Sequence, residues 1–235
     1  MAGPVLELRD VYAAYGRIEV LHGVDLVVPE RSVMALLGPN GAGKSTTIKI
    51  ATGQMRPLRG CVHVADRHVN GATPDALARA GISTIPEGRG IFPNLTVAEN
   101  LWMATYCGVE ADEVEEIAYE RFPRLGERRH QLAGSMSGGE QQMLSISRAL
   151  ATRPALLILD EFSMGLAPII VQDLYEIVKQ IAREGVSILL VEQFAHIALS
   201  VADYAAVMTH GKIRAVGQPA DVEAELSGAY LGDMA

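Results

Sequence analysis

The order of apolar and polar positions along the chain predicts an α/β fold. Residues 5–16 and 18–28 alternate apolar and polar side chains, which is typical of strands with one exposed face. Residues 33–37 (VMALL) form a short, wholly apolar run before a glycine, as expected for a buried parallel strand. Similar strand patterns recur farther along the chain, at 81–86, 155–160, 186–193 and 204–211.

Helical patterns separate these strands. A run with helical spacing begins near Lys44 and stops at Gly53. The clearest helical segment covers residues 167–184. Strands that alternate with helices imply a parallel sheet covered by helices.

The middle of the chain has a different character. Between Thr96 and Ala151 there are only helical patterns, which are interrupted at 122–129 (FPRLGERR) and at the glycine-rich stretch 133–142. We therefore expect a single domain, 1–235, with a helical lobe inserted into an α/β core. The boundaries expected from the sequence are 1–88 and 152–235 for the core, with an N-terminal β subdomain, and 89–151 for the lobe.

Charge and cysteine content narrow the function. The 28 acidic and 20 basic residues give a formal net charge of −8, which argues against broad nucleic-acid binding because that needs cationic phosphate contacts. Cys61 and Cys107 lie far apart without a CxxC spacing, so we expect neither a zinc site nor a disulfide framework.

The chain shows no sign of entering a membrane by itself. No apolar run approaches the ~18 residues that cross a bilayer. Glu7, Arg9 and Asp10 stand where a signal peptide would need its apolar stretch. We expect a cytosolic protein with no membrane span of its own, whose membrane role comes through a partner.

A glycine-rich stretch after the apolar run 33–37 predicts a phosphate site. It fits G-x-x-x-x-G-K-[ST], between a strand and a helix as this motif requires. Its glycines let backbone N–H groups converge on phosphate oxygens, and the helix N-terminus favours an anion. Lys44 is expected to reach the β- and γ-phosphates and Ser45 to bind Mg²⁺. The whole stretch comprises Gly38, Pro39, Asn40, Gly41, Ala42, Gly43, Lys44, Ser45 and Thr46.

Two carboxylates follow another buried strand. Asp160 ends the run 155–160, where it is suited to hold Mg²⁺, and Glu161 is placed to orient or deprotonate a water. An Asp-Glu pair there could instead cap the next helix. After a phosphate loop, however, the pair favours a P-loop NTPase.

A second glycine-rich stretch, MSGGEQQMLSISRAL at 136–150, resembles the signature sequence of ABC-type ATPases. The resemblance covers essentially the whole chain. It implies a RecA-like parallel-sheet core, an antiparallel β subdomain and an inserted helical lobe. It also implies that two cassettes pack head to tail, each signature loop closing over ATP held by the other. The residues carried over are Ser137, Gly138, Gly139 and Glu140, and Tyr15 as the aromatic that stacks on adenine.

Shorter segments resemble the ATP-binding subunits of importers for branched-chain, hydrophobic amino acids. They are PEGR at 86–89, GLAP at 165–168, VEQ at 191–193 and AYLG at 229–232. Related urea or amide importers look similar. In this group Glu87 takes the place of a glutamine that contacts Mg²⁺ and the attacking water, and Gln193 takes the place of a switch histidine.

The chain departs from this group at two positions. Phe162 replaces a proline and Phe194 an asparagine, which puts the rate of hydrolysis in doubt more than the reaction. His196, one helical turn beyond Gln193, is expected to be structural.

The resemblance also implies the partners. They are transmembrane permease subunits, on the cytoplasmic face of the membrane, and a second cassette in a homo- or heterodimer. The segment 89–100 is the expected coupling surface. A soluble cassette acting on DNA or the ribosome, and a regulatory cassette that binds ATP with little hydrolysis, are the alternatives from other classes.

Overall fold

The computed structural model describes residues 4–88, 90–223 and 226. Two features of the sequence lie outside the described residues: Arg89, at the start of the expected coupling segment, and the stretch AYLG at 229–232.

A six-stranded sheet forms the core within the described residues, in the order β10-β9-β3-β8-β7-β6. The strands from β9 to β6 are parallel, as the sequence predicts, and β10 pairs antiparallel with β9 at the edge. Because β10 is antiparallel, the sheet is not entirely parallel, and the sequence patterns did not predict this strand. The bounds are β3 (Val33–Leu37), β6 (Ile82–Ile85), β7 (Leu156–Asp160), β8 (Ser187–Glu192), β9 (Tyr204–Thr209) and β10 (Lys212–Gly217).

A second, antiparallel sheet has the order β2-β1-β4-β5. It confirms the antiparallel subdomain, although the sequence patterns identified only the first two of its strands. Its strands are β1 (Pro4–Tyr15), β2 (Ile18–Pro29), β4 (Arg59–Val64) and β5 (Arg67–His68).

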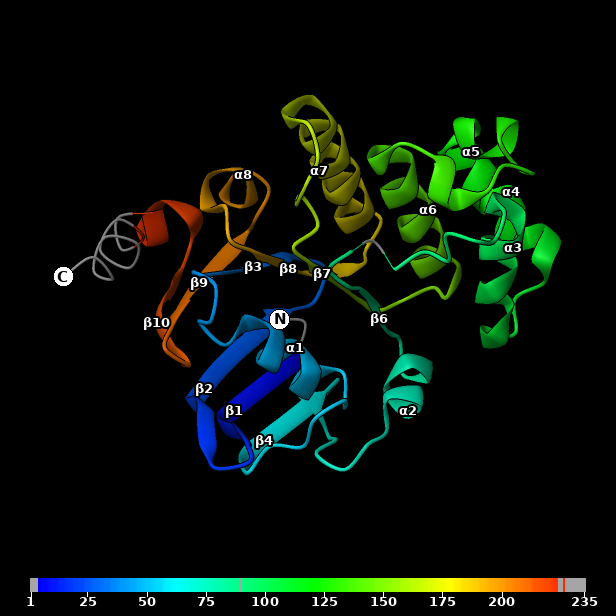
Figure 1. The fold of residues 1–235 in the computed structure, drawn as a ribbon. Helices are drawn as coiled ribbons and strands as arrows, with labels where there is room; N and C mark the ends of the chain where they lie inside the picture. Colours follow the sequence, from blue (N-terminus) through cyan, green and yellow to red (C-terminus); the bar gives the residue numbers. More distant parts are fainter. Residues whose placement is uncertain (1–3, 89, 224–225, 227–235) are drawn as a thin grey trace.

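Helix α1 (Lys44–Ala51) lies between the two sheets (Figure 1). Because successive strand residues face opposite sides, Met34 and Leu36 join the apolar cluster that contains Ile48 and the antiparallel sheet. Ala35 and Leu37 of the same strand belong to the cluster on the other face. The core sheet is therefore buried on both faces, which explains the continuous apolar run of β3.

The other face of the core sheet is covered by α7 (Pro168–Arg183) and α8 (Ala195–Leu199), while α2 (Pro74–Arg79) precedes β6 (Figure 1). The buried residues of α7 recur at helical spacing: Val171, Leu174, Tyr175, Val178 and Ile181. This confirms the helix predicted at 167–184.

Helices make up the middle of the chain, at the opposite end of the molecule from β10 (Figure 1). Within the described residues, an isolated bridge between Thr96 and Leu132 is the nearest approach to a strand there. The predicted interruption at 122–129 is shorter than expected, because a helix resumes directly after Phe122 with a proline in its first turn. The elements are α3 (Val97–Trp102), η1 (Met103–Cys107), α4 (Ala111–Arg121), α5 (Pro123–Glu127), η2 (Ala133–Ser135) and α6 (Gly138–Ala151).

None of the helices within residues 4–88, 90–223 and 226 combines the length and the apolar character that spanning a bilayer would require.

Candidate active site

The carboxyl ends of four parallel strands meet at one edge of the core sheet. The register places Leu37 of β3 beside Glu192 of β8, and Val191 of β8 beside Asp160 of β7. Ligands of open α/β sheets bind at this edge, because the loops that follow the strands converge there. The loops after β3, β6, β7 and β8 carry Lys44, Glu87, Glu161 and Gln193.

The loop after β3 depends on glycine at defined positions. Gly41 and Gly43 have φ angles of 80° and 111°, in the left-handed region where other residues are strained. A Cβ atom on Gly38 would lie 2.2 Å from the carbonyl oxygen of Met208. The loop ends where α1 begins, so the first amides of this helix, with no partner inside it, face the end of the loop.

Lys44 is enclosed by this loop, with only 4% of the residue exposed. Its Nζ donates hydrogen bonds to the carbonyl oxygens of Gly38 at 2.9 Å and Pro39 at 3.3 Å. Glu161 approaches the same nitrogen at 3.7 Å. A buried ammonium group needs such acceptors, and phosphate oxygens are stronger ones. Ser45, next to it, is exposed on the first turn of α1.

Asp160 is the most perturbed carboxyl at this edge. Burial, together with the neighbouring charges of Glu161 and Glu87, raises its pKa from the usual 3.8 to about 6, although Lys44 acts in the opposite direction. Its Oδ1 is buried and has no hydrogen-bond partner among the residues that the structure describes. An acceptor of this kind calls for a cation or a bound water.

The residues present fit a magnesium ion. Mg²⁺ prefers a few carboxylate or hydroxyl oxygens and completes its shell with water and substrate phosphates. Asp160 and Ser45 supply such oxygens. In the described part of the chain, no group of three or more His, Cys, Asp or Glu side chains forms a complete metal cage.

Glu87 and Glu161 face a common cavity of about 340 Å³. Gln142 and Met164 complete its wall together with Gly88. Glu161 follows β7 directly and adopts a φ of 47°, in the left-handed region that side-chain-bearing residues seldom occupy. Its conformation must therefore be fixed by the surroundings.

Three hydrogen bonds fix this turn. The amide of Glu161 donates to Val191 of β8 at 2.9 Å. The amide of Ser163 donates to the Glu192 carboxylate at 3.0 Å. The side chain of Gln142 donates to the carbonyl of Phe162, also at 2.9 Å. Nothing in the spacing of Gln142 and Glu192 links them to the turn after β7, so the sequence predicts neither residue as part of the site.

Glu192 is itself a buried carboxylate, 1% exposed, that also accepts a hydrogen bond from Tyr175 Oη at 2.8 Å. Burial raises its pKa. The next residue, Gln193, is half-buried at the same edge of the sheet. Two residues that the sequence singled out nearby, Phe194 and His196, are exposed at the start of α8.

The second glycine-rich stretch is built as a helix cap. Ser137 is the N-cap of α6, and its hydroxyl and amide donate to the Glu140 carboxylate at 2.8 and 2.9 Å. Arg128 holds the other oxygen of Glu140 at 3.1 Å. Ser137 is exposed, whereas Glu140 is 7% exposed and orders the loop. A Cβ on Gly139 would lie 2.7 Å from Cγ2 of Ile170, so any larger residue there would have to displace this side chain of α7.

The two glycine-rich stretches are separate in this structure. Within the described residues, no hydrogen bond joins 133–140 to the loop 38–46.

Tyr15 lies beside α1, at the end of β1. Its ring is 47% exposed, and Lys49 Nζ lies 3.1 Å from its hydroxyl. Hydrogen bonds that the Tyr15 hydroxyl accepts from the side chains of Thr46 and Lys49 lower its pKa. The structure thus places an exposed aromatic ring next to the helix that follows the glycine-rich loop.

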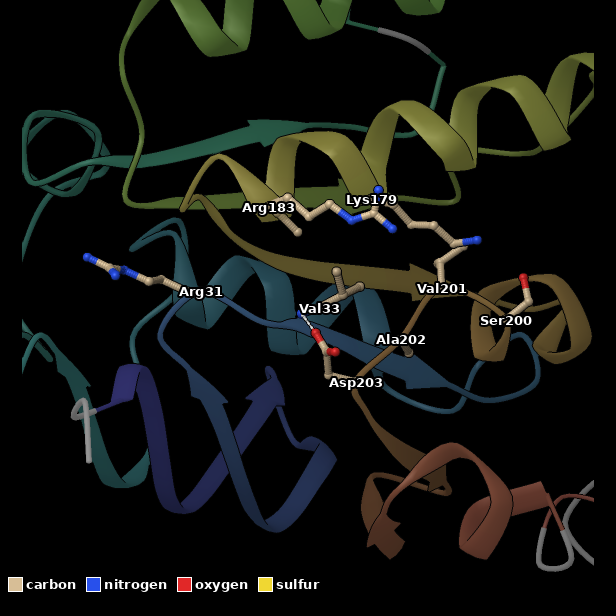
Figure 2. A pocket seen from close by; sticks show the side chains of 9 residues that line it. Arg31, Val33, Lys179, Arg183, Ser200, Val201, Ala202 and Asp203 are labelled. Atoms are coloured by element: carbon tan, nitrogen blue, oxygen red, sulfur yellow. Dashed lines mark hydrogen bonds between the residues drawn. The ribbon is translucent and has the colours of Figure 1, made fainter.

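A different cavity, of about 360 Å³, opens at the amino end of β3 (Figure 2). Three cations line it, but Arg31 extends away from Lys179 and Arg183. The carboxylate of Asp203 accepts a hydrogen bond from the amide of Val33 at 2.8 Å. This cavity is at the opposite end of β3 from the glycine-rich loop and brings none of the predicted site residues together.

The strand-loop-helix geometry at Lys44 and the carboxylates after β7 define a P-loop nucleotide hydrolase. Comparison with protein families finds a match to the ABC transporter family over residues 21–163, which is more than half of the chain.

Comparisons with individual proteins give the same family. The high-affinity branched-chain amino acid transport ATP-binding protein BraG of Pseudomonas aeruginosa is 42% identical, over 97% of this chain and 100% of BraG. The Nod factor export ATP-binding protein I of Cupriavidus pinatubonensis is 34% identical, over 93% of this chain and 67% of that protein. MJ1267, an ATP-binding cassette of an ABC transporter in its ADP conformation, superposes with a TM-score of 0.87, at 27% identity over 97% of this chain and 99% of MJ1267.

The chain therefore belongs to the ABC transporter family, as an ATP-binding and ATP-hydrolysing cassette.

Proposed function

We propose that this cassette powers the uptake of branched-chain or other hydrophobic amino acids. The support is its relatives: identity is 42% to BraG and 34% to the Nod factor exporter, and the BraG match extends over the full length of that protein. The segments PEGR, GLAP and VEQ point the same way. Uptake of urea or an amide is the alternative within the same class of importer.

The edge of the core sheet supplies the groups that hydrolysis needs. Lys44 binds the β- and γ-phosphates, and the amides at the start of α1 hold their oxygens. Tyr15 stacks on the adenine. Glu161 orients the attacking water and accepts its proton, while Gln193 hydrogen-bonds the γ-phosphate.

Ser45 and Asp160 would hold Mg²⁺, and Glu87 would assist in binding the ion and orienting the water. The ion supplies charge neutralisation on the β- and γ-phosphates when it is bound. The buried, unpartnered oxygen of Asp160 and its pKa near 6 support this assignment.

The functional unit is a head-to-tail dimer of cassettes. One observation carries this proposal. Ser137 is exposed at the start of α6 and, among the described residues, makes no hydrogen bond to the phosphate loop of its own chain. Gly138 and Gly139 offer main-chain amides at a helix N-terminus, which suits an anion supplied by a second cassette, and the Ser137 hydroxyl, bonded to Glu140 in this structure, lies beside them. Glu140 keeps this loop in shape.

The dimer works against permease subunits on the cytoplasmic face of the membrane. Large apolar side chains are exposed on and just after the expected coupling segment: Phe92, Trp102, Met103 and Tyr106. Exposed large apolar side chains close together in the sequence are consistent with a protein contact there. We infer that the lobe at 89–151 passes motion between these subunits and the core formed by 1–88 and 152–235.

The test is Glu161→Gln. The variant should bind ATP normally, because the amide leaves Lys44 and the loop in place, and should form an ATP-stabilised dimer on size exclusion. Its hydrolysis should fall about 100-fold or more, as expected when a general base is lost. Glu176→Gln, an exposed carboxylate on α7, is the matched control. Hydrolysis near the parent rate in Glu161→Gln would contradict the assignment of the base.

Substrate class needs a separate measurement. The cassette, its permeases and their binding protein should be reconstituted in liposomes with ATP. Leucine, isoleucine or valine should enter in an ATP-dependent way, whereas uptake of urea or amides alone would overturn the amino-acid assignment.

A further inference from the structure

Gln142 connects two parts of the molecule that serve different nucleotides in the proposed dimer. It lies about one helical turn along α6 from the cap formed by Ser137 and Glu140. Its side chain reaches the turn after β7, which carries Glu161. The inference drawn from this contact rests on the proposed function, since it requires a trans site at Ser137.

The contact of Gln142 is specific and buried. Only 3% of the residue is exposed, and Nε2 donates to the carbonyl of Phe162 at 2.9 Å. Oε1 is buried without a hydrogen-bond partner among the described residues. A buried amide with an unsatisfied oxygen costs stability compared with an apolar side chain of the same shape. Packing alone therefore does not explain a glutamine here, whereas control of the Phe162 carbonyl does.

The turn that Gln142 holds is the one that needs support. Glu161 has a left-handed φ of 47°, which costs free energy in a residue with a side chain. The bonds to Val191 and Glu192 tie the turn to β8 of the same sheet. The bond from Gln142 ties it to α6, an element of the helical lobe.

We propose that Gln142 is a positioning residue that couples the two ATP sites of the dimer. When Ser137 closes on the nucleotide of the partner cassette, α6 is drawn toward that site. The hydrogen bond from Gln142 passes this displacement to Phe162, and the carboxylate of Glu161 in this chain moves into line with its own water. Occupancy of one site thereby sets the catalytic geometry of the other.

The adjacent residue provides a matched control. Gln141 is also buried, at 8% exposure, and also donates its amide to main-chain oxygens. Its acceptors are Ala133 at 3.0 Å and Met136 at 3.1 Å, in the loop before Ser137. Two neighbouring glutamines thus hold two different structures: one holds the signature loop, the other the catalytic turn.

The experiment compares Gln142→Met with Gln141→Met in the full chain. Steady-state ATP hydrolysis gives kcat, KM and the Hill coefficient, and size exclusion gives ATP-dependent dimer formation. Loss of one hydrogen bond in the transition state should lower kcat of Gln142→Met by roughly 3- to 10-fold. Its KM and dimer formation should stay within about twofold of the parent, and its Hill coefficient should fall toward 1. Gln141→Met should instead raise KM and weaken dimer formation.

Two results would overturn the coupling role. One is a Gln142→Met variant with the parent kcat and Hill coefficient. The other is a Gln142→Met variant in which dimer formation, melting temperature and kcat all fall together. That result is expected if Gln142 has only a structural role. If that variant does not fold, Gln142→Leu, which is close in size and also lacks the donor, is held to the same outcomes. A parent chain that neither dimerises with ATP nor hydrolyses it would instead refute the proposed function.

Discussion

The Asp160→Asn substitution should make the nucleotide-free protein more stable while impairing its function. Asp160 ends β7 with a buried oxygen that has no partner among the described residues, beside Glu161 and Glu87. Its pKa is raised to about 6, so at neutral pH the carboxyl is ionised in surroundings that disfavour the charge, and this lowers the stability of the folded protein. Asparagine has nearly the same shape and carries no charge, so this cost is removed.

The magnitude follows from the pKa. A rise from 3.8 to about 6 corresponds to an upper bound of about 3 kcal/mol above pH 6. Because the side chain is partly exposed and water screens it, we take about half, about 1–2 kcal/mol. For a chain of this length, that gain raises the melting temperature by roughly 3–6 °C.

The gain has a defined pH dependence. Between pH 3.8 and about 6 the folded protein binds more protons at Asp160 than the unfolded chain does, so the stability of the parent falls as the pH rises through this window. Below it the carboxyl is protonated in both states. The advantage of Asp160→Asn should therefore be largest above pH 6 and should shrink toward pH 4.

Thermal unfolding followed by circular dichroism from pH 4.5 to 8 is the assay. Asp173→Asn, an exposed position on α7, makes the same chemical change and should shift the melting temperature by no more than about 1 °C. ATP with Mg²⁺ should stabilise the parent more than Asp160→Asn, because the variant loses a carboxylate ligand. Equal melting temperatures at pH 7.5, or a gain that persists unchanged at pH 4.5, would refute the reasoning.

Three other substitutions test separate parts of the site. Lys44→Met keeps the apolar stem and should weaken ATP binding about 10- to 100-fold in a calorimetric titration, because a charge-assisted bond to phosphate is lost; unchanged affinity would remove Lys44 from the site. Ser137→Arg should leave ATP binding by the monomer intact and abolish dimer closure, and full hydrolysis by this variant would exclude the trans role. Gln193→Ala should lose most of its ATP hydrolysis, while Gln193→His should remain active. The ratio of the turnover of Gln193→His to that of the parent should change near pH ~6.5, because the introduced histidine titrates there. Parent-like turnover in Gln193→Ala would make Gln193 a packing residue.

Local signals explain what could be predicted from the sequence. The glycine-rich loop, β3 and α1 are contiguous, and the positive φ angles at Gly41 and Gly43 are what its glycines indicate. The carboxylates after β7 are also adjacent in sequence to the strand that positions them. Their meeting with Lys44 follows from parallel pairing, which the alternation of strands and helices already implies.

Contacts between distant segments could not be predicted in this way. The strand β4 mixes polar and apolar residues without strict alternation, and β10 is exposed at every second position, so neither pattern stood out. Gln142 and Glu192 are joined to residues 162 and 163 by tertiary packing alone. In the sequence they look like an ordinary helix surface and a strand end.

Hydrogen bonding differs between the two glycine-rich stretches, and this difference bears on the order of events in the dimer that we propose. At the signature loop, the cap between Ser137 and Glu140 is complete and Arg128 neutralises its charge, so the loop is already ordered. At the phosphate site, Asp160 Oδ1 lacks a hydrogen-bond partner among the described residues, and Lys44 lies against Glu161. The phosphate site therefore gains most from a ligand that brings a cation for its carboxylates and oxygens for its lysine. Mg²⁺ with ATP would bring both, so in the dimer that we propose, binding at this site is the step that prepares each cassette to meet the signature loop of the other.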